Sequence, residues 1–199
     1  MLRQLLRNSL LGLQKINRGI LKITASEIKR YHVSSPDYDE TETMKQKLAD
    51  LRNTRKPIYL TSLEFDEILK WKLRSQYGRQ QDARKVNTEE IIRSVTGLAL
   101  NISHIDQDYK LELQIGILSS IRGVGIPFAS AILALIFPGE YAVIDFRVWR
   151  QVFGYDATSF TVSDYKKYMK VLRNFSNELG WPVQEVDLAI WTYDLKNSS

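Results

Sequence analysis

The chain has 199 residues, 44% of them hydrophobic, and a formal net charge of +5 at pH 7, as expected for a globular protein with one ordinary core or two small lobes that share an interface. It contains no cysteine, which excludes disulfides, thiolate zinc sites and cysteine-ligated iron–sulfur clusters and favours a reducing, intracellular location. Its two histidines are too few for a histidine-built metal centre.

The positive charge is concentrated near the N-terminus. Residues 1–36 hold seven lysines and arginines and one glutamate, whereas the rest of the chain holds 21 basic and 22 acidic residues. A nucleic-acid surface on this nearly neutral part must therefore be a local patch. One candidate patch consists of basic residues interleaved with Trp71 and Tyr77, namely Lys70, Lys72, Arg74, Arg79, Arg84 and Lys85. A solvated helix face is the alternative interpretation of the same residues.

The first element expected along the chain is an amphipathic helix over residues 1–30. Its apolar side chains recur at spacings of three and four, with basic residues between them: Leu2, Leu6, Leu10, Leu13, Ile16, Ile20 and Ile23. Such a helix is expected to dock on the core or on a protein partner. Rich in arginine and almost free of acids, it is also typical of a mitochondrial transit peptide if the source is eukaryotic. No apolar run reaches membrane-spanning length, so no membrane span is expected.

A linker over residues 33–40, rich in Ser, Pro and Asp, divides the chain into two predicted parts. These parts are 1–36, the basic helix and linker, and 37–199, a helical domain. Hydrophobic spacing predicts helices at about 41–53, 62–78, 88–101, 146–153, 162–179 and 183–196, and a pair at about 111–137. The expected caps are Thr61 or Ser62, Asn87 or Thr88, and Gly180, with Pro182 opening the last helix. The acids of that helix are expected to face outward.

Strand-like patterns are scarce, with 57–60 and 141–144 the only weak candidates. The predicted fold class is therefore all-α. Two glycines one residue apart, Gly123 and Gly125, separate the two helices at 111–137 and require a sharp turn there. Bare amides at the start of the second helix suit an anion. A plain turn between helices, without a ligand, is the alternative.

The segment from Leu118 to Leu133 reads Leu-Ser-Ser-Ile-Arg-Gly-Val-Gly-Ile-Pro-Phe-Ala-Ser-Ala-Ile-Leu, and Val-Ile-Asp-Phe-Arg-Val-Trp-Arg follows at 143–150. In this order and at this separation, the two motifs resemble the helix-hairpin-helix (HhH-GPD) DNA glycosylase superfamily over about 40 residues, ending at Gly154. The resemblance implies two helical lobes with a cleft between them, and double-stranded DNA as partner. It further implies base excision repair, by hydrolysis of the N-glycosidic bond of a damaged or mispaired base, without an organic cofactor.

The resemblance also assigns roles to residues of both motifs. Those expected to hold DNA phosphates are Arg122, Gly123, Val124, Gly125, Arg147 and Arg150. Hairpins of this family often add a monovalent or divalent cation, bound by main-chain carbonyls near Gly123 and Gly125, and no side-chain metal site is expected. Asp145 matches the family's aspartate that stabilises positive charge on the sugar or orients an attacking water. Its position ahead of a helix suits an N-cap equally well.

Two features depart from the family pattern. Pro127 stands where bifunctional members carry a Schiff-base lysine, so a monofunctional glycosylase that uses water is expected. The residue that fills the gap left by an extruded base has no clean match, and Gln76, in Arg74-Ser-Gln-Tyr-Gly-Arg79, is the nearest. Lys72 and Arg74 beside it are expected to contact DNA. Trp71 is the candidate that stacks on the base, with packing in the core as its alternative.

Two other functions are compatible with the sequence. One is a non-catalytic helix-hairpin-helix DNA-binding module without a base pocket, which the absent lysine and the absent wedge residue favour. The other is a helical interaction protein that acts through its N-terminal helix. A concave pocket with Asp145 at its floor would favour the enzyme, whereas a filled cleft would favour either alternative.

Overall fold

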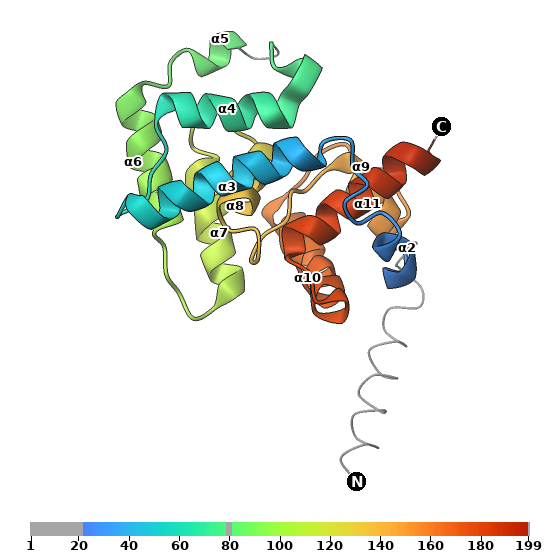
Figure 1. Cartoon of the computed structure of the whole chain (residues 1–199). Helices are drawn as coiled ribbons and strands as arrows, with labels where there is room; N and C mark the ends of the chain where they lie inside the picture. Colours follow the sequence, from blue (N-terminus) through green and yellow to red (C-terminus); the bar gives the residue numbers. More distant parts are fainter. Residues whose placement is uncertain (1–21, 79–80, 199) are drawn as a thin grey trace.

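All regular structure that the computed structural model describes, over residues 22–78 and 81–198, is helical (Figure 1). This agrees with the predicted all-α class. The elements are α2 (Ala25–Lys29), α3 (Tyr38–Thr54), α4 (Ser62–Leu73), the 3₁₀ helix η1 (Arg74–Gln76), α5 (Gln81–Arg84), α6 (Glu89–Leu100), α7 (Gln107–Leu118), α8 (Ile126–Ile136), α9 (Phe146–Phe153), α10 (Val162–Leu179) and α11 (Val183–Asn197). None of these helices is both long and apolar enough to cross a membrane.

Local sequence signals place several helix ends where they are expected. Thr61 and Thr88 are the N-caps of α4 and α6, and each hydroxyl accepts the backbone N–H three residues ahead. Gly180 ends α10 in the left-handed conformation, with φ of 71°. The helices α9 and α10 begin and end at the predicted residues. Prediction succeeds here because each end depends on residues close by in the chain.

The structure corrects other expectations. The helix expected over 1–30 does not continue to its end, because Thr24 is extended and caps a separate helix, α2. Residues 1–21 lie outside the described part of the chain. The helix expected at 62–78 ends at Leu73, where Arg74 adopts φ of 50°. Helix α3 begins at Tyr38, within the segment 33–40 that was expected to hold a turn and a helix start, and slightly before the expected start at about 41. The acids of α11 do not all face outward, because Asp187 and Asp194 are buried.

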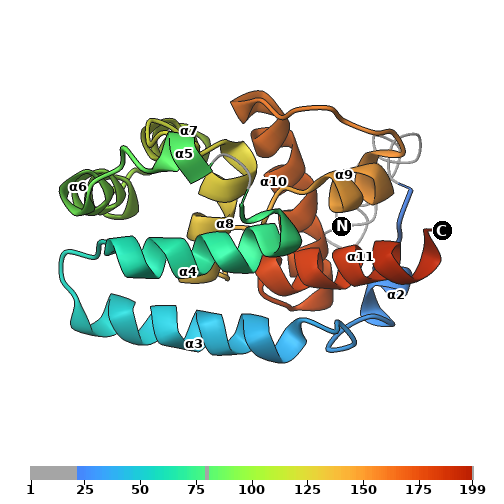
Figure 2. The same ribbon diagram turned by 90° about the horizontal axis from the view of Figure 1, so that it is seen from above.

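The helix α8 lies at the centre of the described fold. Every residue from Phe128 to Ile136 is buried, because the helix is apolar on nearly every side. It contacts α3, α4 and α7, and Figure 2 shows α3 and α4 running side by side. The helix α10 packs against α7 and α11, and α11 against α9 and α2. Ile23 and Ile28 are also buried, so residues just ahead of and within α2 contribute to this core.

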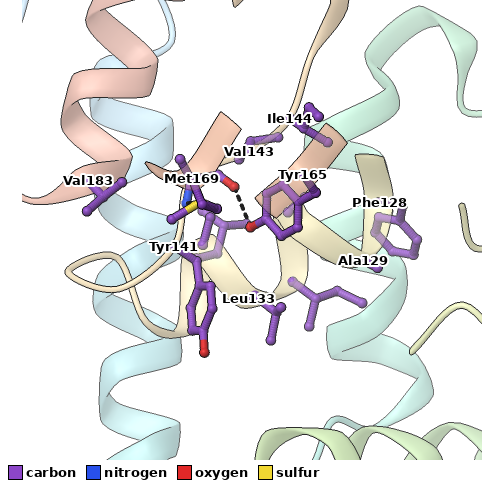
Figure 3. Close-up of a cluster of buried hydrophobic side chains, with 14 of the residues drawn as sticks. Phe128, Ala129, Leu133, Tyr141, Val143, Ile144, Tyr165, Met169 and Val183 are labelled. Atoms are coloured by element: carbon purple, nitrogen blue, oxygen red, sulfur yellow. Dashed lines mark hydrogen bonds between the residues drawn. The ribbon is translucent and has the colours of Figure 1, made fainter. Parts of the chain in front are cut away.

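A buried segment without regular structure, Tyr141–Ile144, connects the region of α8 to α9 (Figure 3). This strand candidate has no strand partner among the described residues, so side chains satisfy its peptide groups. Tyr165 and Tyr168 donate to the carbonyls of Ala142 and Val143 at 2.8 and 3.0 Å, and the N–H groups of Val143 and Ile144 donate to Asp187 and Ser130 at 3.0 and 3.1 Å. The segment is held by side chains of α8, α10 and α11 rather than by a sheet.

The turn between α7 and α8 requires glycine at only one of its two glycine positions, and this can be tested. Gly123 has φ of 81°, whereas Gly125 has φ of −96° and is the N-cap of α8. We expect Gly123→Ala to lower the free energy of unfolding by about 1–2 kcal/mol, because a Cβ is strained at positive φ. Gly125→Asn should stabilise by about 0.5 kcal/mol or less, since asparagine is a better N-cap than glycine. Urea unfolding of both variants measures the difference, and equal stabilities would contradict it.

Candidate functional site

The two predicted binding features are the hairpin and the surroundings of Asp145. In the hairpin, α7 ends at Leu118 and α8 begins at Ile126, so helices flank the two glycines as predicted. The N–H groups of Gly125 and Ile126 make no hydrogen bond to another described residue, as is usual for the first turn of a helix. The backbone of Arg122 is held by Asn87, through bonds of 2.8 and 3.2 Å. The hairpin therefore presents free amides and an exposed arginine.

A pocket with about 550 Å³ of empty space, counted to its open mouth, lies beside Asp145. Its walls come from the start of α3, the end of α4, the segment ahead of α9 and the first half of α11, which approach one another in Figure 2. The lining residues are Asp37, Thr41, Trp71, Lys72, Arg74, Val143, Asp145, Gln184, Asp187, Leu188 and Trp191. The structure thus brings together four of the predicted site residues: Trp71, Lys72, Arg74 and Asp145.

Asp145 is bound through both carboxylate oxygens. Oδ1 accepts the backbone N–H of Arg147 at 2.9 Å, which makes Asp145 the N-cap of α9, and Oδ2 accepts from Lys72 Nζ at 2.9 Å. Burial raises the pKa of Asp145, but Lys72 and the amide of Arg147 outweigh burial and hold the pKa below its ordinary value of 3.8. Asp145 is therefore an ionised, oriented carboxylate at neutral pH. The predicted cap is present, and the pocket beside it leaves a catalytic role open.

A second carboxyl, Asp187 of α11, lines the same pocket and was not among the expected site residues. Oδ1 accepts from the hydroxyl of Tyr168 at 2.9 Å, and Oδ2 accepts the N–H of Val143 at 3.0 Å. Burial raises the pKa of Asp187 from 3.8 to about 7, although the bond from Tyr168 and the charge of Lys72 act against burial. The pocket thus holds two carboxyl groups whose pKa values are displaced in opposite directions.

Aromatic and amide groups complete the pocket. Trp71 is half-buried, and its ring N–H donates to Thr41 at 3.2 Å, so the indole lines the pocket while also packing on the core. Trp191 lies along the same pocket from α11. Gln184 is buried, and its Oε1 has no hydrogen-bond partner among the described residues. A buried amide oxygen of this kind can accept a hydrogen bond from a ligand N–H group.

Two arginines expected on DNA are engaged within the fold. Arg147 donates to Asp194 at 2.9 Å, and Arg150 donates to both carboxylate oxygens of Asp194 at 2.6 and 2.7 Å. Asp194 is fully buried, which raises its pKa, but the bonds from Arg150, Gln151 and Arg147 prevail and lower the pKa to about 2. This ion-pair cluster stabilises the protein above the ordinary pKa of aspartate, and that stability is lost as the pH falls toward 2.

The basic stretch around α4 is also largely ion-paired. Lys70 pairs with Asp66 at 2.8 Å, Lys72 with Asp145 at 2.9 Å, Lys85 with Asp82 at 2.6 Å, and Arg74 with Asp37 at 3.4 Å and with Glu40. Arg79 lies outside the described residues. Gln76, the nearest match to the family's wedge residue, is exposed in η1 and is not part of the pocket wall. Four of the described cations of the stretch, Lys70, Lys72, Arg74 and Lys85, are therefore ion-paired within the protein.

The described residues offer no metal centre built from side chains. No group of three or more His, Asp or Glu side chains among them is arranged to hold a metal ion. At the hairpin, the carbonyl of Gly125 accepts the N–H groups of Phe128 and Ala129 at 3.0 Å each, in the first turn of α8. Any cation there would use other main-chain carbonyls or share this one.

Comparison of the chain with protein-family models, curated proteins and solved structures gives no match. The family resemblance thus rests on the two sequence motifs. Function has to be argued from the groups that the pocket and the hairpin present.

The contact between Lys72 and Asp145 makes a prediction about stability. Because only 13% of the Lys72 side chain and 24% of the Asp145 side chain are exposed, removing one partner leaves a largely buried charge. We expect Asp145→Asn to cost about 2 kcal/mol, less than for a fully buried pair. The double variant Lys72→Met/Asp145→Asn should lose less stability than Asp145→Asn alone, because it leaves no unpaired charge. Thermal or urea unfolding of the unmodified protein, Lys72→Met, Asp145→Asn and the double variant measures the coupling between the two residues. If the stability losses of the two single variants add up to that of the double variant, the pair is not a stabilising contact.

Proposed function

We propose that the chain is a DNA-binding protein that hydrolyses the N-glycosidic bond of a damaged or mispaired base. The observation that carries this proposal is Asp145, an ionised carboxylate held by two bonds beside a pocket lined by two tryptophans. A concave pocket with Asp145 at its floor was expected to favour an enzyme over a binding module, and Asp145 is among the residues that line this pocket. The two-lobed fold of the family belongs to the same proposal.

The pocket suits a flat heterocycle. The indoles of Trp71 and Trp191 provide apolar faces that can stack on an extruded base, whatever its identity. The free oxygen of Gln184 accepts a hydrogen bond, and every common nucleobase carries an N–H group on one of its edges. A base that is already mispaired or damaged costs less to extrude, which favours such bases as substrates.

Asp145 supplies the charge that the reaction needs. As the glycosidic bond breaks, positive charge develops on the sugar, and a fixed carboxylate stabilises it without having to reorganise. The depressed pKa of Asp145 keeps this carboxylate ionised at neutral pH. Lys72 balances its charge in the free protein, and so keeps the cost of burying the carboxylate low.

The hairpin serves the same function by holding the DNA backbone. The free amides of Gly125 and Ile126, at the positive end of the α8 dipole, can hold a phosphate of the DNA backbone, and the exposed Arg122 adds charge beside them. Contacts of this kind position the duplex and are independent of base sequence.

A non-catalytic DNA-binding module is the second candidate. It is favoured by the internal ion pairs of Arg147, Arg150, Lys72 and Arg74, because paired cations contribute less to phosphate binding than free ones. Such a module would bind duplex DNA through the hairpin and leave the base intact. The oligonucleotide screen described next separates the candidates.

The activity is tested with duplex oligonucleotides that carry different lesions and mispairs. We expect at least one to be converted to an intact abasic site, visible as strand cleavage only after alkali. Asp145→Asn should slow this reaction by a factor of about 1,000, because it removes the charge that faces the sugar. Lys72→Met/Asp145→Asn controls for the uncompensated lysine and should be equally slow. Absence of abasic sites with every substrate would refute the enzyme and leave the binding module.

Borohydride should trap no covalent adduct with DNA, since Pro127 carries no amine and Lys72 is engaged with Asp145. An adduct that maps to Lys72 would show a lyase step and would contradict the monofunctional reaction.

DNA binding through the hairpin is tested by a matched pair of variants at Gly125. Asparagine and aspartate are both good N-caps, so both variants should fold, but only aspartate places a negative charge where the phosphate is expected. We expect Gly125→Asp to bind duplexes of any sequence about tenfold more weakly than Gly125→Asn at 0.1 M salt or below, with a smaller difference at higher salt. Fluorescence anisotropy measures the affinities. Equal affinities of the two variants would exclude the hairpin as the phosphate site.

A further inference from the structure

Asp187 is a buried acid in the pocket that the proposed reaction does not yet use. We propose that Asp187 is the general base of the site, which takes a proton from the water that attacks the sugar, while Asp145 stabilises the developing cation. This inference rests on the proposed function and adds a second catalytic carboxyl to it. It comes from the way Asp187 is bound, on the side of the pocket formed by α11.

The hydroxyl of Tyr168 gives Asp187 two protonation states without moving heavy atoms. This hydroxyl lies 2.9 Å from Asp187 Oδ1 and 3.0 Å from the carbonyl oxygen of Val143, and it has one hydrogen to donate. When Asp187 is ionised, Tyr168 donates to the carboxylate. When Asp187 is protonated, its O–H can donate to Tyr168, which turns its own hydrogen to the carbonyl of Val143. Each state keeps the hydrogen bond between Asp187 and Tyr168, and in the protonated state Tyr168 also donates to the carbonyl of Val143.

The second oxygen of Asp187 is compatible with both states as well. Oδ2 accepts the N–H of Val143 at 3.0 Å, and a carboxyl oxygen can accept this bond whether or not the group carries a proton on Oδ1. Proton uptake therefore breaks none of the contacts that hold the buried segment Tyr141–Ile144. A group that must change protonation during each turnover needs this property.

The charged and titratable groups around Asp187 come from every element that lines its side of the pocket. Lys72 of α4 favours its ionised form, and Asp145, ahead of α9, favours its neutral form. Tyr168 of α10 donates to the ionised form, and Tyr165, one turn before it, is kept neutral because burial raises its pKa well above 10.

The remaining charged groups of the pocket wall are Asp37 and Arg74, which pair with each other at 3.4 Å. With burial as the largest effect, the pKa of Asp187 lies at about 7, where a carboxylate is a far better base than Asp145 and is still ionised in a large fraction of molecules.

The two carboxyls thus divide the reaction between them. The bond from C1′ to the base nitrogen breaks, and its electron pair leaves with the base. The water oxygen forms a bond to C1′, and one water proton passes to Asp187. Solvent protonates the departing base, and Asp187 returns its proton to solvent before the next turnover. Asp145, with both oxygens bound and a depressed pKa, stays ionised throughout.

The test is the pH dependence of single-turnover cleavage, measured on the lesion substrate that the oligonucleotide screen identifies. For the unmodified protein, we expect the rate to rise with pH and to level off above about 7, because only ionised Asp187 accepts the proton. Asp187→Asn should be slower by a factor of about 100 at pH 8 and should lose this rise. Asparagine fits the site, because its Oδ1 can accept from Val143 while its NH₂ donates to Tyr168.

Tyr168→Phe provides the second readout. It removes a donor to the ionised carboxylate, so the midpoint of the pH profile should move to higher pH. The cleavage rate should still level off, but at a more alkaline pH. A merely structural role of Asp187 would not predict this shift. Glu185→Gln, a neighbour on α11 outside the pocket wall, is the control and should keep the original profile.

Each outcome bears on a separate claim. If the protein cleaves a lesion and Asp187→Asn keeps both the rate and the pH profile, the general-base role is refuted and the proposed function stands. An unchanged midpoint in Tyr168→Phe would also count against it. If the unmodified protein cleaves no lesion, the proposed function fails, and the role of Asp187 in it fails as well.

Discussion

The described fold depends on how one buried stretch of backbone is hydrogen-bonded. Between α8 and α9, residues Ala142–Ile144 are neither in a helix nor beside a strand, yet their peptide groups are shielded from water. An unpaired peptide group in such a place costs as much as several favourable contacts provide. Side chains of α8, α10 and α11 meet this demand, with Tyr165, Tyr168 and Asp187 prominent among them. The relative positions of these three helices are therefore set by the segment that they surround.

The same requirement explains why acids and amides lie in the pocket. Asp187 accepts the backbone N–H of Val143 and also lines the pocket. The free-energy cost of burying its carboxyl is therefore offset by a hydrogen bond that the fold needs in any case. Asp145 follows the segment directly and caps α9, which orients its carboxylate toward Lys72. Carboxyl groups that also bind backbone N–H groups are held rigidly, and rigidity of this kind lowers the reorganisation needed if charge develops beside them.

Features that depend on neighbouring residues could be predicted from the sequence. The end of α10 follows from Gly180, and the turn at Gly123 follows from glycine itself. Features that join distant residues could not, such as the pair of Lys72 and Asp145, 73 residues apart. Asp187 was missed because the acids of its helix were expected to face water. The spacing 183, 187, 190 and 194 nevertheless places two aspartates on the stripe of Val183 and Ile190, and this was the signal that could have found them.

The manner in which the buried segment is held also has a consequence for the order of folding. The side-chain bonds to its backbone reach across 14 to 44 residues of chain, from the bond between Ser130 and Ile144 to the bond between Val143 and Asp187. Closing such loops costs entropy before any bond is gained. The segment therefore cannot become ordered on its own while the helices that follow it are still forming. Helix α8 can pack early on α7, which directly precedes it in the chain, whereas the pocket needs residues as far apart as Asp37 and Trp191 and therefore forms only in a late, long-range step of folding.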